Sequence, residues 1–161
     1  MTAKQMLEFL AEFHRDKVGL WKTHEASSRY VADYNVNNTY QYIIAREDMH
    51  VRWVEDAILE HGAPVADVPV PQVNPPDKRG AEMWVIRSDR DAAEKFVAKW
   101  RPRVDALPNA RQRIMLGVII GETLEQKRFF EQALEGREDL LGRRADGAGT
   151  PGAVLPTRWV E

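Results

Sequence analysis

The chain has 161 residues, a formal net charge of −2 and 30% charged residues, so its length suits one domain with a single sizeable core. It contains no cysteine, which excludes disulfides, thiolate zinc sites and iron–sulfur clusters and leaves His, Asp and Glu as candidate metal ligands. Positive and negative charges are interspersed, and no stretch approaches the roughly 18 apolar residues of a membrane span, so we expect neither nucleic-acid nor membrane binding.

The first predicted element is a long helix from Lys4 to about Tyr34. This stretch has no proline, and acidic and basic residues interrupt its beginning, unlike the apolar run of a signal peptide. A cytoplasmic protein is therefore expected. The apolar residues that recur at helical spacing are Leu7, Leu10, Val18, Trp21 and Val31.

Residues 35–38 read Asn, Val, Asn, Asn, which favours a tight turn, and Asn38 can cap a following helix. The second helix is predicted over about residues 38–61. Gly62 follows it, and glycine is the usual residue just past a helix end. The inward face predicted for this helix consists of Ile43, Glu47, His50, Val54 and Ala57.

Residues 62–87 are predicted to form a long crossover, because five prolines at positions 64, 69, 71, 75 and 76 remove donors and block regular helix. A connection of this length must cross the length of the fold or be functional in itself. Ser88 with Asp91 resembles a capping box and predicts the start of the third helix. Pro102 is expected to kink or shorten that helix.

Pro108 and Asn109 predict the next turn, and a fourth helix then runs to about Gly136. The sequence therefore predicts an all-α bundle over residues 1–141. Glycine, proline and polar residues dominate positions 142–161, which are expected to form a flexible tail.

Two segments, residues 45–62 and 121–137, resemble each other, with Glu47 aligned to Glu122 and His50 to Glu125. Residues 25 and 47 are equally far from position 36, and residues 94 and 122 are equally far from position 108. Each helical hairpin can thus bring two glutamates to one level. If the two turns lie at opposite ends, the levels of both hairpins coincide near the middle of the bundle.

This pattern resembles the ferritin-like superfamily, in particular the rubrerythrin and bacterioferritin type, over about residues 4–136. The resemblance implies an up-down four-helix bundle with a long crossover between helices 2 and 3. Family members bind two iron or manganese ions through one Glu on helices 1 and 3 and a Glu-x-x-His pair on helices 2 and 4. The corresponding metal ligands in this chain are Glu25, Glu47, His50, Glu94, Glu122 and Glu125.

The departure from the family pattern is Glu125, which stands where the second histidine is expected. A carboxylate in place of imidazole makes the donor set harder and favours manganese or ferric iron over copper. The resemblance implies oxidoreductase chemistry with dioxygen, peroxide or a metal ion, and a homodimer. His24 neighbours Glu25 but points about a quarter turn aside, so it is not included in the ligand set.

A second reading belongs to another functional class. Several unpaired carboxylates are costly to bury without a cation, and Arg29, Arg101 or Arg111 can supply one as an ion pair. The chain is then a metal-free, non-catalytic bundle that serves as a structural or interaction module.

Overall fold

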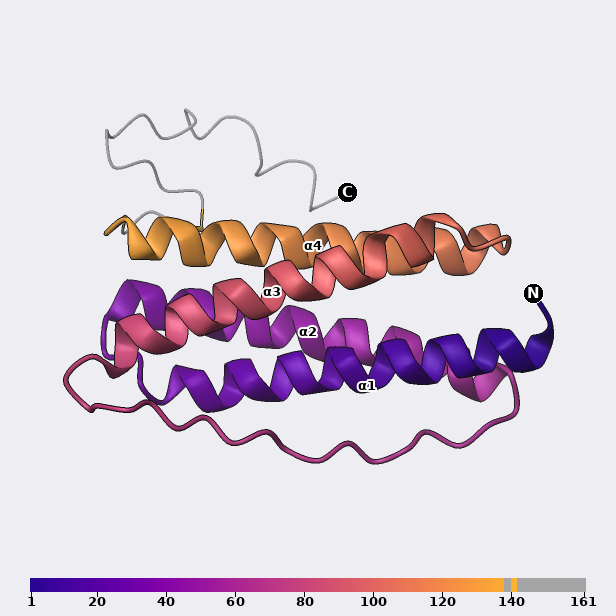
Figure 1. The fold of residues 1–161 in the computed structure, drawn as a ribbon, viewed down its shortest axis with the longest axis horizontal. Coiled ribbons are helices and arrows are strands. Elements are labelled where there is room, and N and C mark those ends of the chain that lie inside the picture. Colours follow the sequence, from indigo (N-terminus) through magenta and orange to yellow (C-terminus); the bar gives the residue numbers. More distant parts are fainter. Residues whose placement is uncertain (138–139, 142–161) are drawn as a thin grey trace, which may run out of the picture.

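The computed structural model describes residues 1–137 and 140–141, and within them the only regular elements are four helices (Figure 1). They are α1 (Ala3–Ser28), α2 (Tyr34–Glu60), α3 (Ala81–Asp105) and α4 (Ala110–Leu134). The all-α prediction is confirmed. The predicted flexible tail, residues 142–161, lies outside the described residues. Among the described helices, none combines the length and apolar character needed to cross a membrane.

The four helices form two hairpins, α1 with α2 and α3 with α4, which meet through α1–α3 and α2–α4 contacts. The turn of the first hairpin and the turn of the second lie at opposite ends of the bundle (Figure 1). Residues 61–80 therefore run along its whole length, beside α1. The hydroxyl of Tyr30 donates a hydrogen bond to the Val73 carbonyl at 3.1 Å, and this bond fastens the connection to the end of α1.

The first hairpin turn lies earlier in the chain than predicted. α1 ends at Ser28 and α2 begins at Tyr34, so the boundaries predicted at Tyr34 and residue 38 are wrong. Asp33 has extended backbone, and its carboxylate accepts a hydrogen bond from the Val36 amide at 2.9 Å. The Asn37 side chain donates to the Ser28 carbonyl at 3.1 Å. These bonds pair a backbone amide at the start of α2 and a backbone carbonyl at the end of α1, which have no partner within their own helix.

The third helix also begins earlier, at Ala81 after Gly80. The predicted start at Ser88 is wrong, because Val85 and Ile86 already pack into the core and their burial outweighs a local capping signal. The connection is therefore residues 61–80 rather than 62–87. Pro102 lies in the last turn of α3, which continues to Asp105. The predicted C-terminal glycine of helix 2 is confirmed, since Gly62 has a φ of +77°.

Two apolar clusters fill the two ends of the bundle. In the larger one, the rings of Phe9 and Phe13 pack edge-on against Trp100, with centroids 5.3 Å and 4.9 Å away. In the smaller one, Tyr40 packs against Phe130 at 5.3 Å between centroids. Buried polar side chains lie between these clusters. The apolar ends thus isolate a charged layer from water.

We predict that Asp33→Ala lowers the free energy of unfolding by about 1 kcal/mol, because it removes the capping bond to the Val36 amide. Asn38→Ala is the matched control, since Asn38 is exposed and lies inside α2. Urea denaturation of the two variants measures the difference. An equal loss in both variants would contradict the assignment of Asp33 as the cap.

Candidate functional site: a buried charged cluster

The centre of the charged layer is the ammonium group of Lys17 on α1. Its Nζ lies 2.8 Å from Glu47 Oε1 on α2 and 3.3 Å from Thr123 Oγ1 on α4. The Phe96 ring of α3 lies with its centroid 5.4 Å from the same nitrogen. The side chains of Lys17 and Glu47 are both 0% exposed. One cation therefore contacts the other three helices from inside the bundle.

The second oxygen of Glu47 pairs with His24 of α1, whose Nδ1 lies 2.6 Å from Oε2. Burial raises the pKa of Glu47, but His24 and Lys17 outweigh it and lower the pKa to about 2. Burial lowers the pKa of His24, and the neighbouring Glu47 charge overcomes this effect, so the net shift is upward. Glu47 is therefore a carboxylate at neutral pH, held by two nitrogen donors.

A second buried acid, Asp89 of α3, lies beside this pair. Its Oδ2 accepts a hydrogen bond from the Tyr40 hydroxyl at 2.6 Å. Burial raises the pKa of Asp89, against the opposing influence of the His24 charge and the Tyr40 hydrogen bond. The pKa of Tyr40 is raised by burial and by Asp89. All four helices thus contribute to the cluster, which we define as Lys17, His24, Tyr40, Glu47, Asp89 and Thr123.

His50 and Glu122 form a separate pair at the α2–α4 edge. His50 Nε2 lies 2.7 Å from Glu122 Oε2, and Arg46 binds both carboxylate oxygens of Glu122 at 3.0 Å and 2.5 Å. Burial and the Lys17 charge lower the pKa of His50 to about 4, although Glu122 acts in the opposite direction. His50 is therefore neutral at pH 7, and the Glu122 charge is matched by Arg46.

The other three predicted ligands lie on the surface. Glu25, Glu94 and Glu125 have side chains that are 38%, 62% and 48% exposed. Each is paired with a basic neighbour, and the pairs are Glu25–Lys22, Glu94–Lys127 and Glu125–Arg128. The structure therefore brings Glu47, His50 and Glu122 to one region and leaves these three acids outside it.

The donor set does not fit the two-metal centre that the family resemblance implies. Within residues 1–137 and 140–141, no three His, Asp or Glu side chains are placed so as to hold one ion. An ammonium group also lies at hydrogen-bonding distance from Glu47, whose side chain is fully buried. One of the arginines predicted to pair with the acids, Arg111, binds Glu60 at 2.9 Å on the surface. In the interior, the cation that pairs with a buried acid is Lys17.

Sequence reasoning missed Lys17, His24 and Asp89. A signal for the first two was present in the spacing of α1, where one stripe of buried residues recurs at intervals of three or four residues. This stripe contains Leu10, Phe13, Lys17, Leu20, His24 and Ser27. Lys17 and His24 interrupt this stripe as polar residues at core positions, which is the pattern of a buried pair.

Comparisons of the chain with protein-family models, with curated proteins and with solved structures give no match. The resemblance to ferritin-like proteins therefore stays a prediction based on residue pattern.

We predict that Lys17→Met lowers the free energy of unfolding by about 3–5 kcal/mol at pH 7, because it leaves the Glu47 charge buried without its ammonium partner. The double variant Lys17→Met/Glu47→Leu should recover most of this loss, since it removes both charges together. Urea denaturation of the single and double variants measures the coupling. A double variant no more stable than the single variant would contradict the pairing.

We predict that His50 makes stability fall as the pH is lowered from 7 to 5. Its pKa is about 4 in the folded chain and near 6.5 when unfolded, so the unfolded chain binds the extra proton over this range. The expected loss is about 2 kcal/mol. In His50→Gln, the difference in unfolding free energy between pH 7 and pH 5 should shrink by that amount. An unchanged difference would show that the pKa of His50 is the same in the folded and the unfolded chain, and would contradict the prediction.

Proposed function

We propose that the chain is a ferritin-like four-helix bundle in which the Lys17 ammonium replaces the metal ions, and that it acts as a non-catalytic binding or structural module. The observation that carries this proposal is the position of Lys17 Nζ, fully buried between Glu47 and Thr123. The metal-free reading of the sequence anticipated such a bundle but looked for arginine as the cation.

The ammonium does for Glu47 what a metal ion would otherwise do. A buried carboxylate requires a positive partner, and Lys17 supplies it together with His24. A divalent ion at Glu47 would lie close to a fixed positive charge and would be repelled by it. The ammonium also offers no open coordination position to dioxygen or peroxide. Redox chemistry of the ferritin type therefore has little support from this interior.

The ferritin-like part of the proposal is supported by the arrangement of the helices. Two hairpins with turns at opposite ends are joined by a connection that runs the length of the bundle (Figure 1). The Glu47-x-x-His50 pair of α2 points inward, as such bundles place it, since both side chains are 0% exposed. The parallel pair of α4 does not, because Glu125 faces outward.

We propose a non-catalytic role because a substrate has no access to the buried cluster. His24 and Glu47 form a base-and-carboxylate pair at 2.6 Å, which in an open site can move a proton. Both side chains are fully buried, so a substrate reaches them only if the bundle opens. A scaffold with a sealed polar centre suits binding through its outer surfaces. The cytoplasmic location and the homodimer stay predictions.

Metal loading tests the proposal. Protein incubated anaerobically with Fe(II) or Mn(II) and then desalted should retain far less than one ion per chain by mass spectrometry. Glu47→Ala and His50→Ala should leave this value unchanged, with circular dichroism as the check on folding. The surface variant Glu25→Ala is the control.

Retention of one or two ions per chain, lost in Glu47→Ala and His50→Ala, would overturn the metal-free proposal. If Glu25→Ala also lost the metal, the six-ligand site predicted from the sequence would be reinstated.

A further inference from the structure

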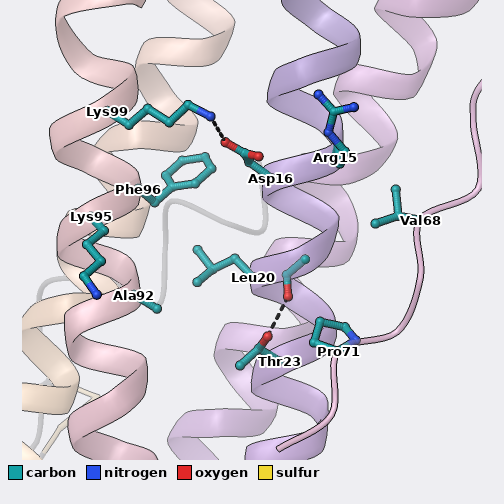
Figure 2. A pocket seen from close by; sticks show the side chains of 11 residues that line it. Arg15, Asp16, Leu20, Thr23, Val68, Pro71, Ala92, Lys95, Phe96 and Lys99 are labelled. Atoms are coloured by element: carbon teal, nitrogen blue, oxygen red, sulfur yellow. Dashed lines mark hydrogen bonds and ion pairs between the residues drawn. The ribbon is translucent and has the colours of Figure 1, made fainter.

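The side of the bundle formed by α2 and α4 exposes large apolar side chains. On α2 they are Tyr42 and Met49, and on α4 they are Ile114 and Val118. The connection of residues 61–80 does not cover them, because it runs beside α1 (Figure 1), with Val68 and Pro71 next to that helix (Figure 2). The described part of the chain therefore leaves this side open.

These side chains lie on one continuous face. Tyr42 lines a pocket together with Glu125 of α4. Arg46, one turn further along α2, binds Glu122 of α4 and lies 3.6 Å from the Met49 sulfur. One stripe of α4, with intervals of three or four residues, contains Ile114, Val118, Glu122 and Glu125. We call the surface made by these residues of the two helices the α2–α4 face.

The middle of α4 is apolar on its outer side as well as on its inner side. Residues 114–121 read Ile, Met, Leu, Gly, Val, Ile, Ile, Gly and contain no polar side chain. Leu116 and Ile119 are buried in the core, whereas Ile114 is 66% exposed and Val118 is also exposed. A helix at the surface of a lone bundle usually carries polar residues on its outer side, and one that is apolar all round is usually covered. We therefore expect another protein surface to pack on α4.

The charges on the α2–α4 face balance one another. Each of three arginines there is paired with a glutamate of the same face. The pairs are Arg46–Glu122, Arg111–Glu60 and Arg128–Glu125. Two copies of this face can therefore meet without net repulsion, whereas a strongly acidic or basic partner finds no complementary charge on it. The charge balance favours a second copy of the chain as the partner.

The size of the face also suits a dimer. α2 has 27 residues and α4 has 25, so each helix is roughly 38 Å long, and two adjacent helices are about 18 Å wide. The face therefore measures roughly 700 Å². This area lies within the about 600–1,000 Å² that each partner buries in a protein interface of standard size.

We propose that the α2–α4 face is the contact surface of a homodimer whose two-fold axis passes close to Val118. A two-fold interface brings the same patch of both subunits together, and Val118 lies in the middle of the apolar run of α4. The Val118 side chains of the two copies therefore meet, with Ile114 and Met49 around them. The inference rests on the proposed function in that it names the partner of the binding module, but it does not depend on the absence of metal.

Sedimentation equilibrium of the full chain tests the assembly. At about 50 µM the unmodified chain should have twice the mass of one chain, with a Kd on the order of 1 µM. Val118→Glu should weaken dimerisation about a hundredfold, because two carboxylates then meet at the axis. Val70→Glu is the matched control, since Val70 is an exposed valine of the connection, and it should leave the dimer intact. Circular dichroism checks that both variants are folded.

A mixture of oppositely charged variants tests the two-fold arrangement. Val118→Lys should be monomeric on its own, like Val118→Glu. In an equal mixture the two variants should form heterodimers, because each ammonium then meets a carboxylate. A substitution that had merely damaged the fold would not be rescued in this way.

Three results would overturn the inference: a monomeric unmodified chain, a Val118→Glu variant that dimerises like the unmodified chain, or a mixture of the two charged variants that stays monomeric. In the first case the face would be left to residues 142–161 or to a different protein. Metal analysis of the same samples separates this inference from the proposed function. A dimer that retains metal would remove the metal-free proposal alone, and a metal-free monomer would remove the dimer alone.

Discussion

The buried contact between Lys17 and Glu47 is the constraint on which the rest of the bundle depends. Neither side chain reaches water, so each charge is tolerated only while the other is in place. The same ammonium also links the two hairpins, because Lys17 of α1 reaches Thr123 on α4. A sliding of one hairpin against the other by one turn, about 5.4 Å along the axis, would separate the ammonium from Thr123 and the Tyr40 hydroxyl of α2 from Asp89 of α3. An apolar interior tolerates such a shift more easily, since hydrophobic contacts have no direction. The hydrogen bonds of the polar layer that cross between the hairpins therefore favour one registry.

The predicted and the observed interior differ in the acids chosen as metal ligands on three helices, each of which lies one residue away from a buried position. On α2 the inward face was predicted correctly, and Ile43, Glu47, His50 and Val54 are all buried. On the other helices the acids chosen as ligands each adjoin the residue that points inward. The inward neighbours of Glu25, Glu94, Glu122 and Glu125 are His24, Ala93, Thr123 and Gln126. One residue turns a helix by about 100°, which moves a carboxylate from the interior to the surface. The buried positions of α2 and α4 do match if the alignment of the two segments is shifted by one residue, so that Glu47 corresponds to Thr123.

The sequence predicted the presence and order of the four helices, but it predicted less well where each helix begins and ends and which of its residues face the interior. Proline content separated the second helix from the third, and Gly62 marked the end of α2. Asn38 looked as good a cap as Asp33, because both side chains can accept from a backbone amide, and only the packing of the α1–α2 turn decides between them. The spacing of α1 places Lys17 on the buried stripe, but its charge argued against burial, since a charged residue is expected to face solvent. Its burial depends on Glu47, a residue thirty positions away, and such long-range pairing is not encoded in local periodicity.

Replacing a divalent ion by an ammonium group changes what a helical bundle can do. Metal pairs draw several carboxylates inward, because two dications offset four or more negative charges. A single ammonium offsets one, and the interior here accordingly contains one ionised glutamate, with His24 and Lys17 on its two oxygens. Burial raises the pKa of the second buried acid, Asp89, which accepts a hydrogen bond from the Tyr40 hydroxyl. Three further glutamates of the metal pattern, Glu25, Glu94 and Glu125, lie outside and are paired with surface bases. Charge balance thus connects the buried position of Lys17 with the outward position of these acids.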